Sequence, residues 1–240
     1  MSKHSKWAKV KTFKGAVDAK RASVFTKLGR AITVAAKQGG GDPAMNFQLR
    51  TAIEKAKEAS MPKETIERAI ARGSGGGDGA VIEEAIYEGF SPGGAAIVAR
   101  ALTDNKNRTL QNLRTIFGKH GGNLAGQNAV TWMFEKKGVL RVPHAESGAD
   151  EFLLRLIDLG AEDVHEEDGG FTVLVPSDKL EAFKAALERE KITVEFAEAS
   201  LLPKERLHFA DLDARARLEG LIEALENDDD VDEVVTNAEL

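Results

Sequence analysis

The chain has 240 residues and a mass of 25.9 kDa, which exceeds a typical domain of about 100 to 200 residues and predicts two or three compact units. Its 42% apolar and 30% charged residues exclude a collagen-like, coiled-coil or disordered protein. The absence of cysteine excludes disulfides, thiolate zinc sites and cysteine nucleophiles, and it fits a reducing cytoplasm. No stretch approaches the ~18 apolar residues of a membrane span, so we expect a cytoplasmic protein without a membrane partner.

The net charge of −6 hides a strong asymmetry along the chain. Residues 1–41 contain ten Lys or Arg against one Asp, a net charge of +9. Residues 142–240 contain nine basic and 27 acidic side chains, a net charge of −18. The basic end predicts a polyanionic partner, and the acidic end is compatible with self-association or a basic partner.

The N-terminal third is expected to be helical. Apolar residues recur at helical spacing until the run stops at the glycines 39–41. Asp42 followed by Pro43 predicts the N-cap and first residue of a second helix, and Pro62 predicts the start of a third. Three short helices of this kind form a bundle, and the glycine-rich residues 73–79 are interpreted as a linker.

From residue 82 the apolar pattern changes to the alternation typical of strands. The expected elements are strands at 82–90 and 95–102, a helix that ends at Gly121, and a strand marked by the alternating Val130, Trp132 and Phe134. The next stretch follows the order strand, helix, strand, strand, helix, strand, which is the ferredoxin-like pattern. Its strands are expected at 139–142, 163–167, 171–175 and 192–200.

A last helix and a short strand with three valines close the sequence. A lone terminal strand needs a sheet to join, so we expect it to complete the middle domain. The predicted fold class is α+β with three domains, an N-terminal three-helix bundle followed by two α+β (ferredoxin-like) domains. The predicted boundaries are 1–80, then 81–134 plus 210–240, with 135–209 inserted as the third domain.

Four motifs resemble one known family. They are His4-Ser5-Lys6-Trp7, Met61-Pro62-Lys63, the segment Tyr-Glu-Gly-Phe-Ser-Pro-Gly-Gly at 87–94, and Ala-Leu-Thr-Asp-Asn-Lys-Asn-Arg-Thr at 101–109. In this order they closely resemble the YebC/PmpR family. The resemblance implies three domains and a role as a DNA-binding transcriptional regulator. Some members are instead ribosome-associated factors that relieve stalling at proline-rich stretches, and a mitochondrial relative activates translation of cytochrome oxidase subunit I.

Residues 3–30, here called the basic arm, suit nucleic acid because phosphates need cations and unpaired bases stack on aromatic faces. Trp7 and Phe13 stand between the charges. The predicted nucleic-acid-binding residues of the arm are Lys3, His4, Lys6, Trp7, Lys9, Lys11, Lys14, Lys20, Arg21, Lys27 and Arg30. The alternative is a solvated helix face whose Trp7 packs on a neighbouring domain.

A second predicted site is the run Asn105, Lys106, Asn107 and Arg108 at a strand-to-helix junction. Amide side chains and cations at a helix N-terminus can hold an anion through both charge and the helix dipole. Capping alone would explain Asp104 or Asn105. It would not explain two cations at a position where they oppose the dipole.

The sequence offers no catalytic constellation. The five histidines show no paired spacing typical of a metal site, GxSxG is absent, and the acidic run 228–233 is interpreted as a solvated turn. We therefore expect a non-enzymatic protein with no metal, no cofactor and no small-molecule substrate. A metal-dependent nuclease and a pure protein-interaction scaffold remain as alternatives of other classes. Within nucleic-acid binding, DNA in transcription leads and ribosomal RNA in translation is the alternative.

Overall fold

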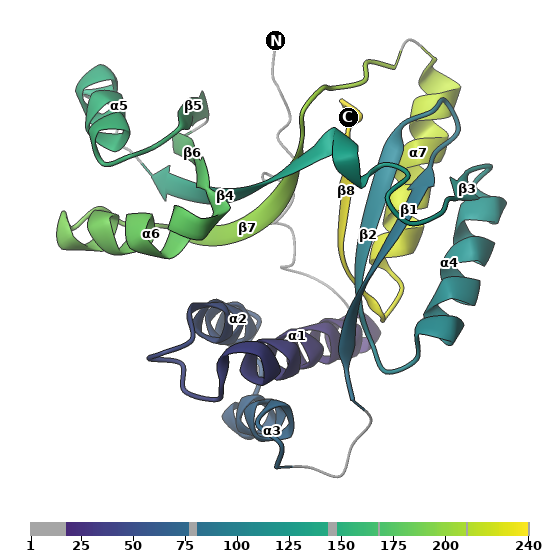
Figure 1. Cartoon of the computed structure of the whole chain (residues 1–240), viewed down its shortest axis with the longest axis horizontal. Helices are drawn as coiled ribbons and strands as arrows, with labels where there is room; N and C mark the ends of the chain where they lie inside the picture. Colours follow the sequence, from purple (N-terminus) through teal and green to yellow (C-terminus); the bar gives the residue numbers. More distant parts are fainter. Residues whose placement is uncertain (1–17, 77–80, 144–147, 168, 210, 240) are drawn as a thin grey trace. The chain divides into compact units, whose positions relative to one another are not determined.

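The structure is a computed structural model that describes residues 18–76, 81–143, 148–167, 169–209 and 211–239, with side chains from residue 22 onward. The chain forms two compact units, residues 1–133 with 205–240 and residues 134–204. Within the first unit a helical bundle and a helix-covered sheet can be distinguished (Figure 1). The second unit is a smaller sheet with two helices.

The bundle consists of α1 (Asp18–Gly39), α2 (Phe47–Glu58) and α3 (Lys63–Gly73). Ile32, Leu49 and Ala56 are fully buried where the helices meet. A Cβ built at Gly73 would lie 2.3 Å from the carbonyl oxygen of Thr33. Only glycine therefore allows the end of α3 to lie this close to α1.

The predicted start of the second helix is wrong. The helix begins at Phe47 rather than at Asp42 and Pro43, because Asn46 supplies the cap. Asn46 Oδ1 accepts a hydrogen bond from the Leu49 backbone N–H, and its Nδ2 donates to the carbonyl oxygens at the end of α1. The Asp42 carboxylate accepts from the Ala44 N–H instead and so forms a turn.

The sheet of the first unit has the strand order β3-β1-β2-β8 and is antiparallel throughout. Its strands are β1 (Glu83–Phe90), β2 (Ala96–Thr103), β3 (Asn123–Leu124) and β8 (Val231–Thr236). The bounds of β1 and β2 agree within about a residue with the predicted strands 82–90 and 95–102, so both predictions are confirmed. Helices α4 (Lys106–Lys119) and α7 (Leu212–Glu226) pack side by side (Figure 1). Phe117 of α4 and Leu221 of α7 are fully buried in the core of this unit. Gly89 lies against Phe117, and a Cβ at this position would clash with the ring.

The predicted strand at Val130, Trp132 and Phe134 is wrong. Residues Thr131–Met133 form a short 3-10 helix, and β4 begins only at Phe134 and runs to Pro143. The physical reason is a competing acceptor. The carboxylate of Glu88 accepts the backbone N–H groups of residues 128, 130 and 131, so these donors are not available to a ladder.

The second unit has the ferredoxin-like fold that the sequence predicts. Its elements are β4, α5 (Ala149–Asp158), β5 (Asp163–Glu167), β6 (Gly170–Pro176), α6 (Leu180–Arg189) and β7 (Phe196–Pro203). The strand order is β5-β6-β4-β7. The fourth strand starts at Phe196, four residues later than expected, because Ile192 closes the end of α6 by donating to the Leu187 carbonyl. No helix among the described residues is long and apolar enough to cross a membrane.

Candidate nucleic-acid interface

Most of the predicted arm lies outside the described residues. This applies to Lys3, His4, Lys6, Trp7, Lys9, Lys11 and Lys14. Lys20 and Arg21 lie on the first turns of α1, where the backbone is described and the side chains are not. The structure therefore places the last part of the arm on a helix and describes the contacts of two of its cations, Lys27 and Arg30.

These two cations of α1 contact the turn between α7 and β8. Lys27 Nζ donates to the Glu226 carbonyl oxygen, and Arg30 Nη1 donates to the Asp229 carbonyl oxygen at 2.6 Å. Ser23 Oγ donates to the Asp229 carboxylate at 2.6 Å. Burial lowers the pKa of Lys27 below its usual value, and nearby carboxylates only partly offset this. Both cations therefore hold the fold of the first unit together.

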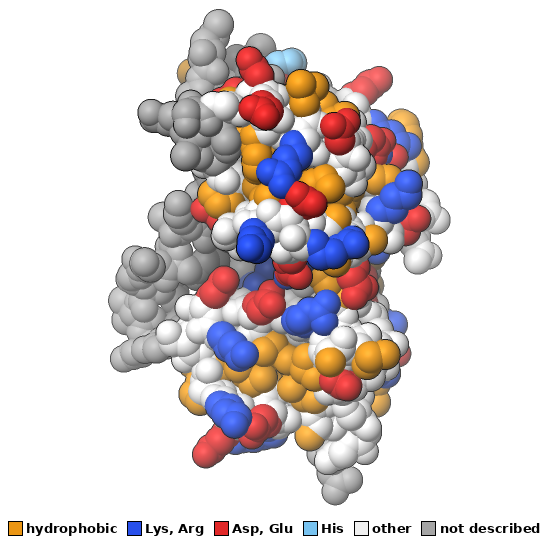
Figure 2. Space-filling view, turned by 90° about the vertical axis from the view of Figure 1, so that its left-hand side faces the viewer, with side chains coloured by type: hydrophobic (Ala, Val, Ile, Leu, Met, Phe, Trp, Pro, Cys, Tyr) orange, Lys and Arg blue, Asp and Glu red, His pale blue; other side chains and the backbone are white. Residues whose placement is uncertain are grey.

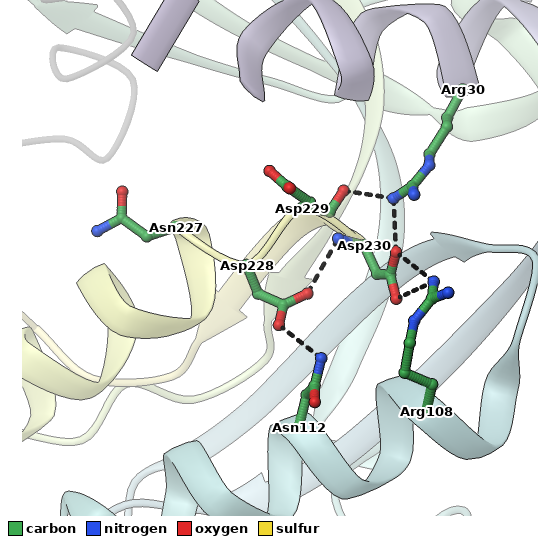
Figure 3. A pocket seen from close by; sticks show the side chains of 7 residues that line it. All are labelled: Arg30, Arg108, Asn112, Asn227, Asp228, Asp229 and Asp230. Atoms are coloured by element: carbon green, nitrogen blue, oxygen red, sulfur yellow. Dashed lines mark hydrogen bonds and ion pairs between the residues drawn. The ribbon is translucent and has the colours of Figure 1, made fainter. Parts of the chain in front are cut away.

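Asp230 joins two helices through one carboxylate (Figure 3). Its side chain lies 2.6 Å from Arg30 Nη1 on α1 and 3.0 Å from Arg108 Nη2 on α4. Thr109 Oγ1 donates to the same carboxylate at 2.7 Å. Only 4% of Asp230 is exposed. Burial alone would raise its pKa, but the hydrogen bonds from Thr109 and Arg108 and the charges of both arginines outweigh burial and lower it.

The interpretation of run 228–233 as a solvated turn is therefore wrong for Asp230, which is buried, and for residues 231–233, which begin β8 (Val231–Thr236). A hollow of about 410 Å³ lies beside this carboxylate. Its lining residues are Arg30, Arg108, Asn112, Asn227, Asp228, Asp229 and Asp230 (Figure 3). Two cations stand against three carboxylates there, so the hollow is not an anion site. The only signal in the sequence was that Asp230 immediately precedes a strand of buried valines.

The second predicted site lies at the start of α4. Asn105 Oδ1 accepts the Arg108 backbone N–H, so this asparagine is the N-cap. Lys106 Nζ lies 2.8 Å from Glu83, and Arg108 Nη2 lies 2.8 Å from Asp104 as well as near Asp230. Carboxylates thus offset the unfavourable dipole of this helix end. Asn107 is exposed and points to no described partner.

Sequence reasoning missed a loop that Glu88 organises. The Glu88 side chain is only 3% exposed, and its oxygens accept three backbone N–H groups at 2.7, 2.7 and 2.8 Å. Burial would raise the pKa of Glu88, but these hydrogen bonds outweigh burial and lower it. The loop ends at Trp132, which is 67% exposed and whose Nε1 donates to the Ala129 carbonyl. A buried carboxylate thus fixes a loop that carries an exposed aromatic ring.

Glu88→Gln is expected to reduce the free energy of unfolding by about 2 kcal/mol, because bonds to a charged acceptor are lost and an amide NH₂ meets backbone donors. Since the folded pKa of Glu88 lies below the usual 4.5, its stabilisation is present above pH 4.5 and is lost as the pH falls through the folded value. Urea unfolding between pH 7 and pH 3 should show the gap between parent and variant shrinking. Glu84→Gln, at an exposed position of the same strand, is the control. A pH-independent gap would contradict this assignment.

Charge on one face of the molecule is mixed. On the face drawn in Figure 2, Lys and Arg side chains lie among Asp and Glu side chains and form no continuous basic field. Among the described residues, no three His, Asp or Glu side chains come together as a metal-binding group. The densest run of cations in the chain is therefore the basic arm.

The fold defines an α+β protein in which a helical bundle precedes a sheet that the chain's last strand completes. Two family models match it, the TACO1/YebC protein N-terminal domain over residues 5–76 and the TACO1/YebC second and third domain over residues 82–238. The chain belongs to the TACO1/YebC family, which confirms the resemblance found in its sequence.

Relatives match over the whole chain. Proteins named probable transcriptional regulatory protein from Pseudothermotoga lettingae and Desulfosudis oleivorans are 47% and 46% identical over 100% of this chain and 94% and 97% of their own length. A crystal structure of a conserved hypothetical protein from Aquifex aeolicus superposes with a TM-score of 0.87 at 42% identity. It covers 98% of this chain and 97% of that one, so the whole architecture is shared.

Proposed function

We propose that this protein is a non-enzymatic regulator of transcription that binds DNA through its basic arm. The observation that carries the proposal is the charge of residues 1–41, ten cations against one carboxylate. Such a density matches the phosphate backbone and exceeds what a solvated helix needs. The names of the relatives support a regulatory role. Because Lys27 and Arg30 contact Glu226 and Asp230 of the same chain, we propose that the part of the arm before residue 27 contacts the DNA.

A second candidate is a translation factor that binds ribosomal RNA. Trp7 and Phe13, which stand between the cations of the arm, favour it because aromatic rings stack on unpaired bases. The two candidates share a cytoplasmic location and a nucleic-acid partner, and they differ in the polymer bound.

Crosslinking in cells, followed by sequencing of bound DNA and RNA in parallel, tests both candidates. Promoter peaks that disappear when the arm is deleted would support transcription. Ribosomal RNA peaks would instead select the second candidate. Retention of a protein partner with no enrichment of either polymer would favour a scaffold and contradict both.

We also propose the three domains expected from the sequence, 1–80, 81–134 plus 210–240, and 135–209. The separation of residues 134–204 into a compact unit of their own supports the insertion. A fragment of residues 135–209 is expected to unfold in one cooperative urea transition. A fragment without a native-like circular dichroism spectrum would contradict the boundaries.

A further inference from the structure

The outer face of α4 carries an unusual set of side chains. Its inner face is apolar and buried at Leu113 and Phe117. The opposite side, here called the α4 outer face, is exposed and consists of Asn107, Arg108, Gln111, Asn112, Arg114, Thr115, Gly118 and Lys119. Every member is cationic, polar without charge, or glycine. None of these residues is acidic, but Arg108 pairs with Asp104 and Asp230, and Asn112 donates to Asp228. The remaining members have no described carboxylate contact.

This lack of acid extends beyond the helix. Residues 105–134 contain four Lys or Arg and no Asp or Glu, whereas the chain average of 39 acidic residues in 240 would place about five there. Other helices balance their cations with acids one turn away, as in Lys63 with Glu67 on α3 and Arg215 with Glu219 on α7. Within the described part of the chain, Arg114 and Lys119 have no such carboxylate partner. Their charges are therefore available to an external anion.

Gly118 is an independent observation on the same face. It lies in the last turn of α4, one residue before the helix ends, where glycine costs less than the ~1 kcal/mol of a helix interior. A Cβ built there meets no atom within 4 Å, and the backbone does not need the left-handed region. Internal packing therefore does not require this glycine. A bare backbone on an exposed helix lets a partner approach closely.

We propose that the α4 outer face binds double-stranded DNA in its major groove, as a second contact surface besides the basic arm. The inference rests on the proposed function and adds a surface to it. An α-helix fits the major groove of B-form DNA, where asparagine and glutamine bond adenine edges and cations meet phosphates. Gln111 is placed for the first role, and Arg114 and Lys119 for the second. Asn112 is not counted, because its amide donates to the Asp228 carboxylate.

The chemistry of the face disfavours other polymers. Single-stranded nucleic acid is held by stacking on exposed aromatic rings, and the only aromatic side chain of α4, Phe117, is fully buried. Double-stranded RNA has a deep, narrow major groove that does not admit a helix. The α4 outer face therefore selects duplex DNA.

Fluorescence anisotropy of the full chain with a mixed-sequence DNA duplex tests the inference. Arg114→Glu with Lys119→Glu is expected to weaken binding at least tenfold and to reduce the slope of log K against log salt by about two. The matched control, Arg189→Glu with Lys191→Glu on exposed positions of the second unit, makes the same change in charge and is expected to change affinity less than twofold.

Gly118→Ala tests the α4 outer face without changing its charge. It is expected to keep or raise the melting temperature and still weaken DNA binding about fivefold or more, because the methyl group prevents close approach. Unchanged affinity in both α4 variants, or loss of single-stranded RNA binding alone, would overturn the inference while leaving the arm's role intact. A parent protein that binds no duplex DNA at all would instead overturn the proposed function.

Discussion

Changing Lys6, Lys9, Lys11 and Lys14 together to glutamate is expected to abolish nucleic-acid binding at physiological salt. Each replacement alters the charge by two, so residues 1–41 change from +9 to +1. If each lysine neutralises one phosphate, the slope of log K against log salt should fall by about 3.6. Anisotropy titrations at several salt concentrations measure both quantities. Circular dichroism should stay unchanged, because these residues lie before the buried core of the bundle.

The control variant for the arm reverses four exposed cations elsewhere in the same domain, Lys55, Lys57, Lys63 and Arg68. Its binding is expected to remain within a few-fold of the parent. Trp7→Ala should weaken binding by about 1 to 3 kcal/mol at all salt concentrations, because stacking is only weakly screened. A four-glutamate variant that is folded and binds DNA, RNA and ribosomes like the parent would refute the role of the arm.

Asp230→Ala is expected to reduce the free energy of unfolding by about 3 kcal/mol. The change removes the shared carboxylate from a buried place. Arg30 then keeps the Asp229 carbonyl and loses its charged partner, and Thr109 keeps only Thr103 and the Asn105 carbonyl. Arg108 is less affected, because it is partly exposed and keeps Asp104. Urea unfolding at pH 7 measures the loss. The neighbouring Asp229→Ala is the control, since its exposed carboxylate accepts only from Ser23 among the described side chains.

The pH dependence of this effect has a defined sign. The folded pKa of Asp230 lies below its usual value of 3.8, so its stabilisation is complete above pH 3.8 and is lost as the pH falls through the folded value. Asp230→Asn keeps the shape and removes the charge, and it should be intermediate in stability at pH 7. Equal losses for Asp230→Ala and Asp229→Ala would show that the carboxylate does not join α1 to α4.

Local patterns predicted the regular elements well because these elements depend on neighbours in the sequence. The strands β1 and β2 and the ferredoxin-like order were predicted correctly, although β2 is buried along almost its whole length and does not alternate. Two of the errors occurred where a side chain bonds the backbone of another element. Asn46 moved the start of α2 because it bonds the end of α1, and Glu88 prevented a strand at 130–132 because it bonds that backbone. The spacing of apolar residues along the sequence does not indicate such bonds.

The candidate site shows the same limit. The sequence identified Arg30 and Arg108 as cations suited to phosphate, but their shared partner lies 200 and 122 residues away along the chain. An ion pair across that separation depends on tertiary folding and leaves no local pattern. The overall charge asymmetry, in contrast, depends only on composition, and the sequence alone is enough to locate the basic arm.

The pairing of β2 with β8 sets an order of events during synthesis. Residues 104–230 separate the two strands. Because a chain is synthesised at ~5 to 20 residues per second, the edge of β2 stays unpaired for roughly 6 to 25 seconds until β8 has been made. An unpaired apolar edge can recruit strands from other nascent chains. Arg100 is the single charged residue of β2, and Asp232 and Glu233 neutralise it only when β8 arrives. A charge on a strand edge opposes such pairing, so we expect Arg100 to reduce aggregation of the growing chain until β8 arrives and then to help fix the register of that strand.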